Sequence, residues 1–197
     1  MISFLKGRLV HKEPTFVVID VNGVGYQVSI SLQTFSEIKD HENILLYTHL
    51  NIREDAHLLY GFSQESEKRL FQQLISVNGV GPNTAMVMLS YMNSQELKTA
   101  IISENTAALQ SIKGIGGKTA QRVIIELKDK LKKESWEETT PSVSAGPHNT
   151  IRKEALSALL TLGLPKGAAE KSVDTVLRKS GNNITLEDLV KQALKNS

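Results

Sequence analysis

The sequence of 197 residues has no cysteine, few aromatic residues and no long apolar run. The absence of cysteine excludes disulfide bonds, thiolate nucleophiles and cysteine-ligated zinc, and it is compatible with a reducing compartment. No segment has the roughly 18 consecutive apolar residues that a membrane-spanning helix needs. The first ten residues, MISFLKGRLV, become charged too soon for a secretory signal. The sequence therefore favours a cytoplasmic protein with no membrane partner.

The net charge of the chain is only +2, which by itself gives little support to a nucleic-acid partner. The distribution of charge is more informative. Residues 1–63 have five basic and seven acidic side chains, whereas residues 64–135 have ten basic and seven acidic ones. Residues 151–197 again have an excess, with eight basic and five acidic side chains. The centre of the chain is thus weakly basic, and a symmetric oligomer would multiply that charge on one face.

The first 64 residues have the alternation and turn signals of short β-strands. Asn22 and Gly23 form a two-residue hairpin signal after a β-branched run, and Glu54 and Asp55 separate a second pair of apolar segments. Five strands and one short helix predict a compact OB-like barrel over 1–64, although other small β-domains fit the spacing too. The short helix is expected over Leu32–Ile38. The expected strands cover Ile2–Val10, Phe16–Val21, Tyr26–Ile30, Ile44–Ile52 and Ala56–Tyr60.

Helical periodicity replaces the alternation from Ser63 onwards, and Ser63 is the expected N-cap of the first helix, with Glu65 in its first turn. Residues 65–140 are therefore predicted to form an all-α domain. Its further helices are expected over Pro82–Tyr91, Ser94–Ser103, Thr106–Ile112 and Gly117–Lys133.

The periodicity stops in a segment rich in serine, threonine and proline, and a flexible linker is expected over 141–148. Beyond it, residues 149–197 are predicted to form a three-helix bundle, with Thr185 and Asp188 as a capping box for its last helix. The complete fold class is thus α+β and multidomain: a barrel, a helical domain and a small bundle. The expected core of the bundle is Leu156, Leu159, Leu160, Val173, Val176, Leu177, Leu189 and Leu194.

The helical domain contains an internal repeat. VNGVGPNTA begins at Val77, and IKGIGGKTA begins 35 residues later at Ile112. A dinucleotide-binding loop would need a preceding strand and a third glycine, but helices precede both copies and threonine occupies the place of that glycine. A phosphate loop of the Walker type is excluded as well, because the Gly-Lys-Thr of the second copy is not preceded, with four residues between, by another glycine. Nucleotide binding is therefore not expected.

Helix, Gly-x-Gly and helix is instead the pattern of a helix-hairpin-helix motif. The glycines allow backbone angles that a side chain would disfavour, and the start of the second helix offers unpaired N–H groups to an anion. The expected ligand is a DNA backbone phosphate, so binding should depend on shape more than on sequence. Val80 and Ile115, between the glycines, should pack inward. The candidate DNA-binding residues are Gly79, Gly81, Asn83, Thr84, Gly114, Gly116, Gly117, Lys118, Thr119 and Arg122.

The whole chain resembles the RuvA family, the junction-binding subunits of the bacterial branch-migration complex. NIREDAHLLYGF at 51–62, NGVGPNTA at 78–85 and GIGGKTAQRVIIELKDKL at 114–131 carry the resemblance. It implies a homotetramer, or an octamer on DNA, that surrounds a four-way Holliday junction in recombination and repair. It also implies that 149–197 recruits a RuvB-type hexameric ATPase, with a RuvC-type resolvase as a further partner. No cofactor or metal is implied.

The same resemblance gives roles to residues whose types alone are uninformative. Glu54 and Asp55 become an acidic pin that repels phosphates at the junction centre, and Arg53 becomes a candidate contact there. Lys often stands in family members where this chain has Asn83 and Gly117, so a shallower salt dependence is expected. In the bundle, the candidate partner contacts are Leu162, Leu164 and Leu189, although core packing is the preferred interpretation of each.

Two other classes of function stay open. One is a general single-strand DNA adaptor, but the barrel aromatics alternate as core residues do. The other is catalysis: a glycosylase would use Lys118 with Asp129, and a metal-dependent nuclease would need Asp20, Glu54 and Asp55 to converge. The five histidines show no metal-binding spacing. A non-catalytic subunit is the preferred interpretation.

Overall fold

The computed structural model describes residues 1–139, 147–180 and 184–195. The chain divides at Thr139 into two compact units, and each is described by itself. Among the described residues, no helix is both long and apolar enough to cross a membrane.

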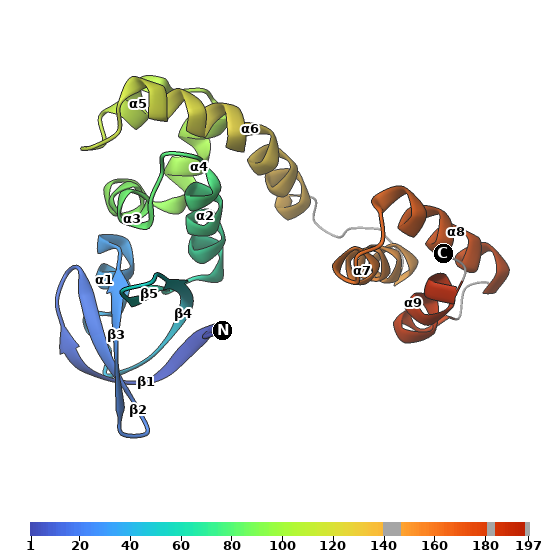
Figure 1. The fold of residues 1–197 in the computed structure, drawn as a ribbon, viewed down its shortest axis with the longest axis horizontal. Coiled ribbons are helices and arrows are strands. Elements are labelled where there is room, and N and C mark those ends of the chain that lie inside the picture. The colour runs from blue at the N-terminus through green and yellow to red at the C-terminus, as the bar shows by residue number, and fades with distance from the viewer. Residues whose placement is uncertain (140–146, 181–183, 196–197) are drawn as a thin grey trace. The chain divides into compact units, whose positions relative to one another are not determined.

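The first unit begins with a closed barrel in which the strands follow the order β1-β2-β3-β5-β4 (Figure 1). Neighbouring strands are antiparallel, except that β3 and β5 pair in parallel through Val28–Ile30 and Leu59–Gly61. The predicted OB-like barrel is thus confirmed. Its elements are β1 (Phe4–Lys12), β2 (Phe16–Val21), β3 (Val24–Ile30), α1 (Leu32–Ile38), β4 (Asn43–Ile52) and β5 (His57–Phe62).

Alternation in the sequence explains the barrel interior. Val17 and Ile19 of β2 are fully buried and their neighbours less so, because successive side chains of a strand point to opposite faces. The β2–β3 turn is made by Asn22 and Gly23, which both have positive φ as a tight two-residue hairpin requires. The predicted hairpin is therefore present.

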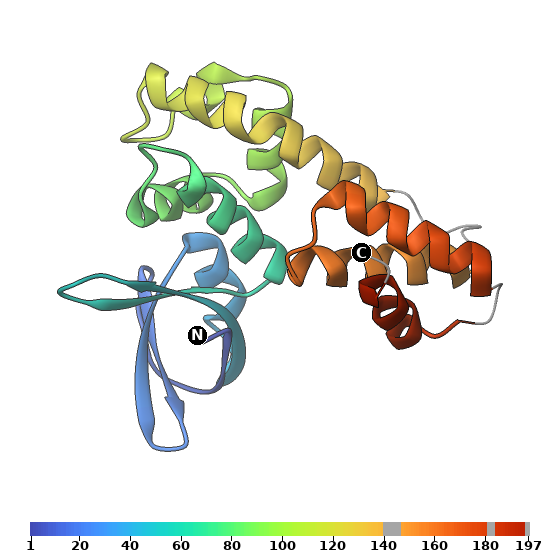
Figure 2. The same cartoon turned by 45° about the vertical axis from the view of Figure 1, so that its right-hand side comes forward.

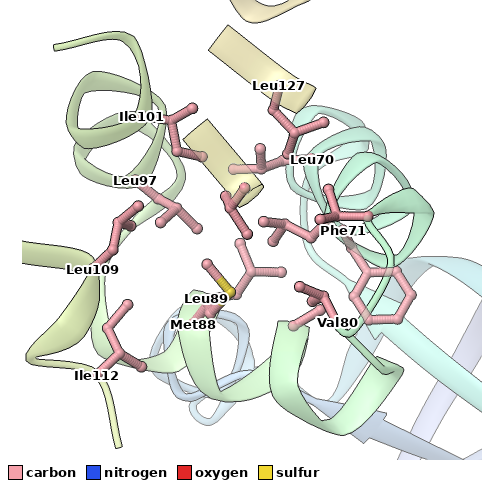
Figure 3. Close-up of a cluster of buried hydrophobic side chains, with 14 of the residues drawn as sticks. Leu70, Phe71, Val80, Met88, Leu89, Leu97, Ile101, Leu109, Ile112 and Leu127 are labelled. Carbon is pink, nitrogen blue, oxygen red and sulfur yellow. The ribbon is translucent and has the colours of Figure 1, made fainter. Parts of the chain in front are cut away.

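Five helices complete the first unit and share one core (Figure 3). Val80 and Ile112, from the two repeated segments, both belong to this core. The helices are α2 (Glu65–Ser76), α3 (Pro82–Tyr91), α4 (Ser94–Ile102), α5 (Thr106–Gln110) and α6 (Gly117–Thr139).

The expected N-cap was wrong by one residue. The cap of α2 is Gln64, whose side chain makes no capping hydrogen bond. Ser63 instead lies where the chain leaves the barrel, and its main-chain N–H donates to Thr34 Oγ1 at 3.3 Å. Tertiary structure overrides the local capping preference of serine here, and the Ser63 hydroxyl has no partner among the described residues.

Helix α2 is anchored to the barrel by a buried carboxylate. Glu67 accepts hydrogen bonds from Ser31 Oγ at 2.6 Å and Thr34 Oγ1 at 2.8 Å, and all three side chains are buried. Burial raises the pKa of Glu67, an effect that the two hydroxyl hydrogen bonds partly oppose. One turn further on, Phe71 packs against Tyr60 and Phe62 of β5, with ring centroids 5.2 and 5.0 Å away. The helix that precedes the first repeated segment is therefore fixed to the barrel.

The second unit contains α7 (Pro147–Thr161), α8 (Lys166–Ser180) and α9 (Leu186–Lys195), as three helices were predicted. Helix α7 begins inside the linker expected over 141–148, since proline suits the first turn of a helix, while 140–146 lie outside the described residues. Thr185 caps α9 by accepting from the N–H of Asp188 at 3.2 Å.

Leu160 and Leu194 were expected in the core but are 44% and 39% exposed. Helical spacing did not reveal which face the neighbours cover.

Candidate nucleic-acid interface

The two repeated segments fold into hairpins with the same main-chain hydrogen bonds. Hairpin 1 consists of α2, the turn Val77–Gly81 and α3, and hairpin 2 consists of α5, the turn around Ile112–Gly116 and α6. In hairpin 1, Val80 N donates to Val77 O at 3.0 Å and Ala85 N to Gly81 O at 3.0 Å. Hairpin 2 repeats both bonds at the same lengths, from Ile115 N to Ile112 O and from Ala120 N to Gly116 O. The sequence repeat is thus a structural repeat.

The two glycines of each hairpin have different roles. Gly79 and Gly114 have φ of +92° and +90°, a region that side chains strongly disfavour. Gly81, by contrast, has φ of −83°, which any residue can adopt. A Cβ atom at Gly81 or at Gly116 would meet nothing within 4 Å. The conformation of the chain therefore explains the first glycine of each pair, and the approach of an external ligand would explain the second.

Unpaired N–H groups gather at the start of α3 and of α6. Within the described residues, no hydrogen bond is donated by the main-chain N–H of Gly79, Gly81, Asn83 or Thr84. The same is true of the corresponding groups in hairpin 2, namely Gly114, Gly116, Lys118 and Thr119, and of Gly117. Such N–H groups at a helix N-terminus form a site for an anion. Val80 and Ile115 are 4% and 5% exposed, so both pack inward as predicted.

The polar side chains differ between the hairpins. Asn83 in hairpin 1 accepts a hydrogen bond from the Tyr60 hydroxyl of β5 at 3.3 Å. Burial raises the pKa of this tyrosine, so it is a donor at neutral pH. Lys118 in hairpin 2 is exposed and, within the described residues, its side chain makes no hydrogen bond or ion pair. Thr84 and Thr119 are half-buried in equivalent positions.

Arg122 reaches from hairpin 2 to hairpin 1. Its Nη1 donates to the main-chain carbonyl of Asn78 at 3.0 Å, and its side chain stays exposed. Sequence reasoning placed Arg122 beside the second hairpin only and missed the Asn78 carbonyl and the Tyr60 hydroxyl. No local pattern could have identified them, because the partners are separated by 44 and 23 residues.

The predicted pin lies at the tip of the β4–β5 hairpin. Arg53, Glu54 and Asp55 are all exposed in a turn that Arg53 N closes by donating to Ala56 O at 2.8 Å. The strands pair as far as Ile52 and His57, whereas the parallel pairing of β5 with β3 begins only at Leu59. Residues 51–58 therefore extend as a two-stranded ribbon, which projects from the barrel in Figure 2. We call it the acidic ribbon.

The candidate contacts in the bundle fall into three environments. Leu162 is 60% exposed and is available to a partner. Leu164 is partly buried against the bundle core. Leu189 is fully buried in the bundle, where α9 packs against α7 and α8, so the structure supports the expectation that it is a core residue and not its candidacy as a partner contact.

The residues of the enzymatic alternatives are not brought together. Lys118 and Asp129 are about three turns apart on α6, or roughly 16 Å along its axis. Asp20 accepts from Gly23 N at 2.7 Å in the β2–β3 turn, whereas Glu54 and Asp55 lie at the tip of another hairpin. Among residues 1–139, 147–180 and 184–195, no three His, Asp or Glu side chains gather as a metal ion would require.

Comparisons with known proteins agree along the whole chain. Residues 1–61 match the family model of the RuvA N-terminal domain, residues 71–129 a SAM-like helix-hairpin-helix tandem, and residues 150–197 the RuvA C-terminal domain. A relative from Cytophaga hutchinsonii is 53% identical over the full length of both chains. Relatives from Christiangramia forsetii and Pseudomonas putida are 49% and 40% identical, each over at least 98% of both chains. All three are named Holliday junction branch migration complex subunit RuvA.

Proposed function

The chain belongs to the RuvA family, and from that premise we propose that it binds four-way Holliday junctions as a non-catalytic subunit in branch migration. The finer parts of the proposal are a homotetramer, or two tetramers on DNA, and a RuvB-type hexameric ATPase that binds residues 149–197. A RuvC-type resolvase is a further partner, and the compartment is the cytoplasm.

The observation that carries the proposal is the matched pair of hairpins. Each presents a set of main-chain N–H groups at a helix N-terminus that are unpaired within the described residues, and each has a second glycine that no described residue requires. Main-chain donors bind phosphate oxygens without reading bases. Two such sites in tandem suit two backbone phosphates along one DNA groove better than a single small anion.

The acidic ribbon supplies the preference for a junction. Glu54 and Asp55 place two carboxylates at the exposed tip of the ribbon. Carboxylates repel DNA phosphates, so an uninterrupted duplex is disfavoured at the tip, whereas the open centre of a junction accommodates it. The hairpins thus provide attraction to any duplex arm, and the ribbon restricts binding to the branched form.

Assembly of several copies would increase the modest positive charge that one chain presents to DNA. Four copies about one axis would multiply the net charge of +3 in residues 64–135 to about +12 on the DNA-binding face. The same symmetry would bring four acidic ribbons together at the centre of the junction. Leu162, exposed on the C-terminal unit, is the candidate contact for the ATPase.

A comparison of three DNA substrates tests the proposal. Affinity for a four-way junction, a linear duplex and a single strand of equal length should be measured at one salt concentration. We expect the junction to bind best by at least about a hundredfold, well within the range between specific and non-specific binding. Equal affinities would contradict the proposal, a preference for the single strand would support the adaptor, and magnesium-dependent cleavage would indicate a nuclease.

Neutralising the ribbon separates its role from that of the hairpins. Glu54→Gln with Asp55→Asn should raise duplex affinity and so reduce the preference for the junction, because repulsion at the tip is removed. Asp40→Asn with Glu42→Gln, which removes two exposed carboxylates between α1 and β4, is a suitable control. Loss of binding to every substrate would show that the ribbon is needed for folding or attraction instead.

A further inference from the structure

The guanidinium of Arg122 lies at a point where it can control the geometry of hairpin 1. It extends from α6, and its Nη1 atom is 3.0 Å from the Asn78 carbonyl oxygen. The same atom lies 3.8 Å from the place that a Cβ atom of Gly79 would occupy. A charged side chain of hairpin 2 thus rests against the turn of hairpin 1.

The Asn78 carbonyl and the Gly79 N–H belong to one peptide group. Because that group is planar and trans, its C=O and N–H point in opposite directions. A hydrogen bond that fixes the carbonyl therefore also fixes the direction of the N–H. Gly79 has φ of +92° and no side chain to restrain it, so an external restraint matters here. The Gly79 N–H is one of the unpaired donors of the candidate interface.

Hairpin 1 receives this restraint from hairpin 2, but among the described residues hairpin 2 receives no equivalent one in return. The repeat places Val87 of hairpin 1 where hairpin 2 has Arg122, and Lys113 of hairpin 2 where hairpin 1 has Asn78. Valine has no donor, and within the described residues no side chain donates to the Lys113 carbonyl. Hairpin 1 therefore depends on hairpin 2, whereas hairpin 2 has no equivalent bond from hairpin 1.

We propose that Arg122 is a positioning residue that holds the phosphate-binding turn of hairpin 1 and couples it to hairpin 2. The part that concerns phosphate rests on the proposed function, whereas the coupling of the two turns does not. A guanidinium has five N–H donors, so the bond to Asn78 leaves others for a phosphate. The competing interpretation is that Arg122 contributes only its charge to DNA binding.

Lys118 provides a matched control for that interpretation. It lies one turn before Arg122 on α6, carries the same charge and makes no side-chain hydrogen bond within the described residues. Arg122→Met and Lys118→Met each remove one positive charge from the same helix. Only the first removes a bond to hairpin 1.

The first measurement uses the protein without DNA. Hydrogen exchange should be followed at the Val80 and Ala85 amides of hairpin 1 and at the equivalent Ile115 and Ala120 amides of hairpin 2, all of which donate hydrogen bonds. In Arg122→Met we expect exchange in hairpin 1 to be roughly tenfold faster, as loss of a charge-assisted bond to the turn predicts. Hairpin 2 should be much less affected, and Lys118→Met should leave both hairpins unchanged.

The second measurement is junction affinity as a function of salt. Lys118→Met should lower the slope of log affinity against log salt by roughly one unit, as loss of one phosphate contact does. Arg122→Met should lower affinity more than Lys118→Met at the same salt, because it also disturbs a second set of donors. If Arg122→Met does not fold, Arg122→Ala, which also removes both the charge and the donor, replaces it in both measurements, with Lys118→Ala as its control.

The outcomes separate the two proposals. Unchanged exchange in hairpin 1 of a folded Arg122 variant would overturn the positioning role, even if DNA binding fell. Faster exchange in hairpin 1 together with unchanged junction affinity would support the coupling of the turns and would contradict the proposed use of hairpin 1 in DNA binding.

Discussion

Hairpins 1 and 2 share one backbone arrangement but differ in what surrounds it. Hairpin 1 has no basic residue between Val77 and Ala85, and its polar side chain Asn83 is bonded to the barrel through Tyr60. Hairpin 2 has Lys113 and Lys118 on exposed positions and receives no such bond from the barrel among the described residues. At the first position of the second helix, Gly117 offers an N–H that Pro82 lacks.

The comparison indicates a division of labour within a repeat. The position of hairpin 1 is fixed by two contacts: α2 is bonded to the barrel, and Arg122 is bonded to the turn. Hairpin 2 carries the charge and one further main-chain donor. Main-chain donors fix where a phosphate lies, whereas lysines contribute attraction that falls with salt. We therefore expect changes in hairpin 2 to alter affinity most.

The largest expected effect is loss of the two lysines of hairpin 2. Lys113→Ala with Lys118→Ala should reduce the salt slope by roughly two units and weaken junction binding by up to about a hundredfold at low salt. The matched change in hairpin 1, Asn78→Ala with Asn83→Ala, should leave the slope unchanged. Binding titrations at several salt concentrations measure both. Equal salt slopes for the two double variants would contradict the proposed difference in role between hairpins 1 and 2.

A smaller effect is expected when hairpin 1 is given the charge that it lacks. Asn83→Lys should raise the salt slope by roughly one unit and junction affinity by up to about tenfold. Because this change also removes the bond to Tyr60, Tyr60→Phe is the control for the lost bond alone. An unchanged slope in Asn83→Lys would mean that no phosphate approaches this position.

The second glycine of each hairpin should separate binding from stability. Gly81→Ala and Gly116→Ala meet no atom within 4 Å, and alanine can adopt the backbone angles recorded at Gly81. Stability should stay constant or rise by about 0.4–1 kcal/mol, because alanine restricts the unfolded chain more than glycine does. Junction affinity should fall several-fold in each variant. Thermal unfolding and binding titrations of the same samples test this, and unaltered affinity would exclude close approach of DNA to these turns.

The smallest expected effect concerns the support of hairpin 1 on the barrel. The pKa of Glu67 is raised in the folded protein, so this carboxyl binds its proton more tightly when folded. The ordinary pKa of this carboxyl in the unfolded chain is about 4.5, and below that pH its stabilising contribution is complete. The contribution is lost as pH rises through the higher pKa of the folded protein. Glu67→Gln cannot ionise, so wild type should lose stability relative to this variant as pH increases.

The measurement is thermal unfolding of both proteins between pH 4 and 7. Burial and Lys68 lower the pKa of His49, which changes stability with pH in the opposite direction to Glu67, but His49 is present in both proteins and its contribution should cancel from the difference. Exchange at Val80 should follow the change more closely than exchange at Ile115. A difference in stability that does not vary with pH would show that Glu67 keeps its ordinary ionisation.

The sequence predicted what depends on local pattern. The bounds of α3 and the positions of the paired glycines follow from Pro82, from helical periodicity and from the repeat itself. It did not predict what depends on distant partners, such as the burial of Glu67 or the bond from Arg122 to Asn78. Periodicity gives the apolar face of a helix but not the element that covers it, so Leu189 was assigned both to the core and to the partner contacts, and the exposed Leu160 was assigned to the core.

The shape of the acidic ribbon also bears on aggregation. Within the closed barrel the strands are paired on both sides, but along the ribbon, among the residues that the structure describes, the two strands pair only with each other. Its two outer edges are thus open to strand addition by another molecule, and Ile52 beside the turn is 65% exposed. The carboxylates of Glu54 and Asp55 protect these edges, because charge at an edge discourages pairing. A protein whose ribbon has been neutralised should therefore self-associate at lower concentration, whatever DNA it prefers.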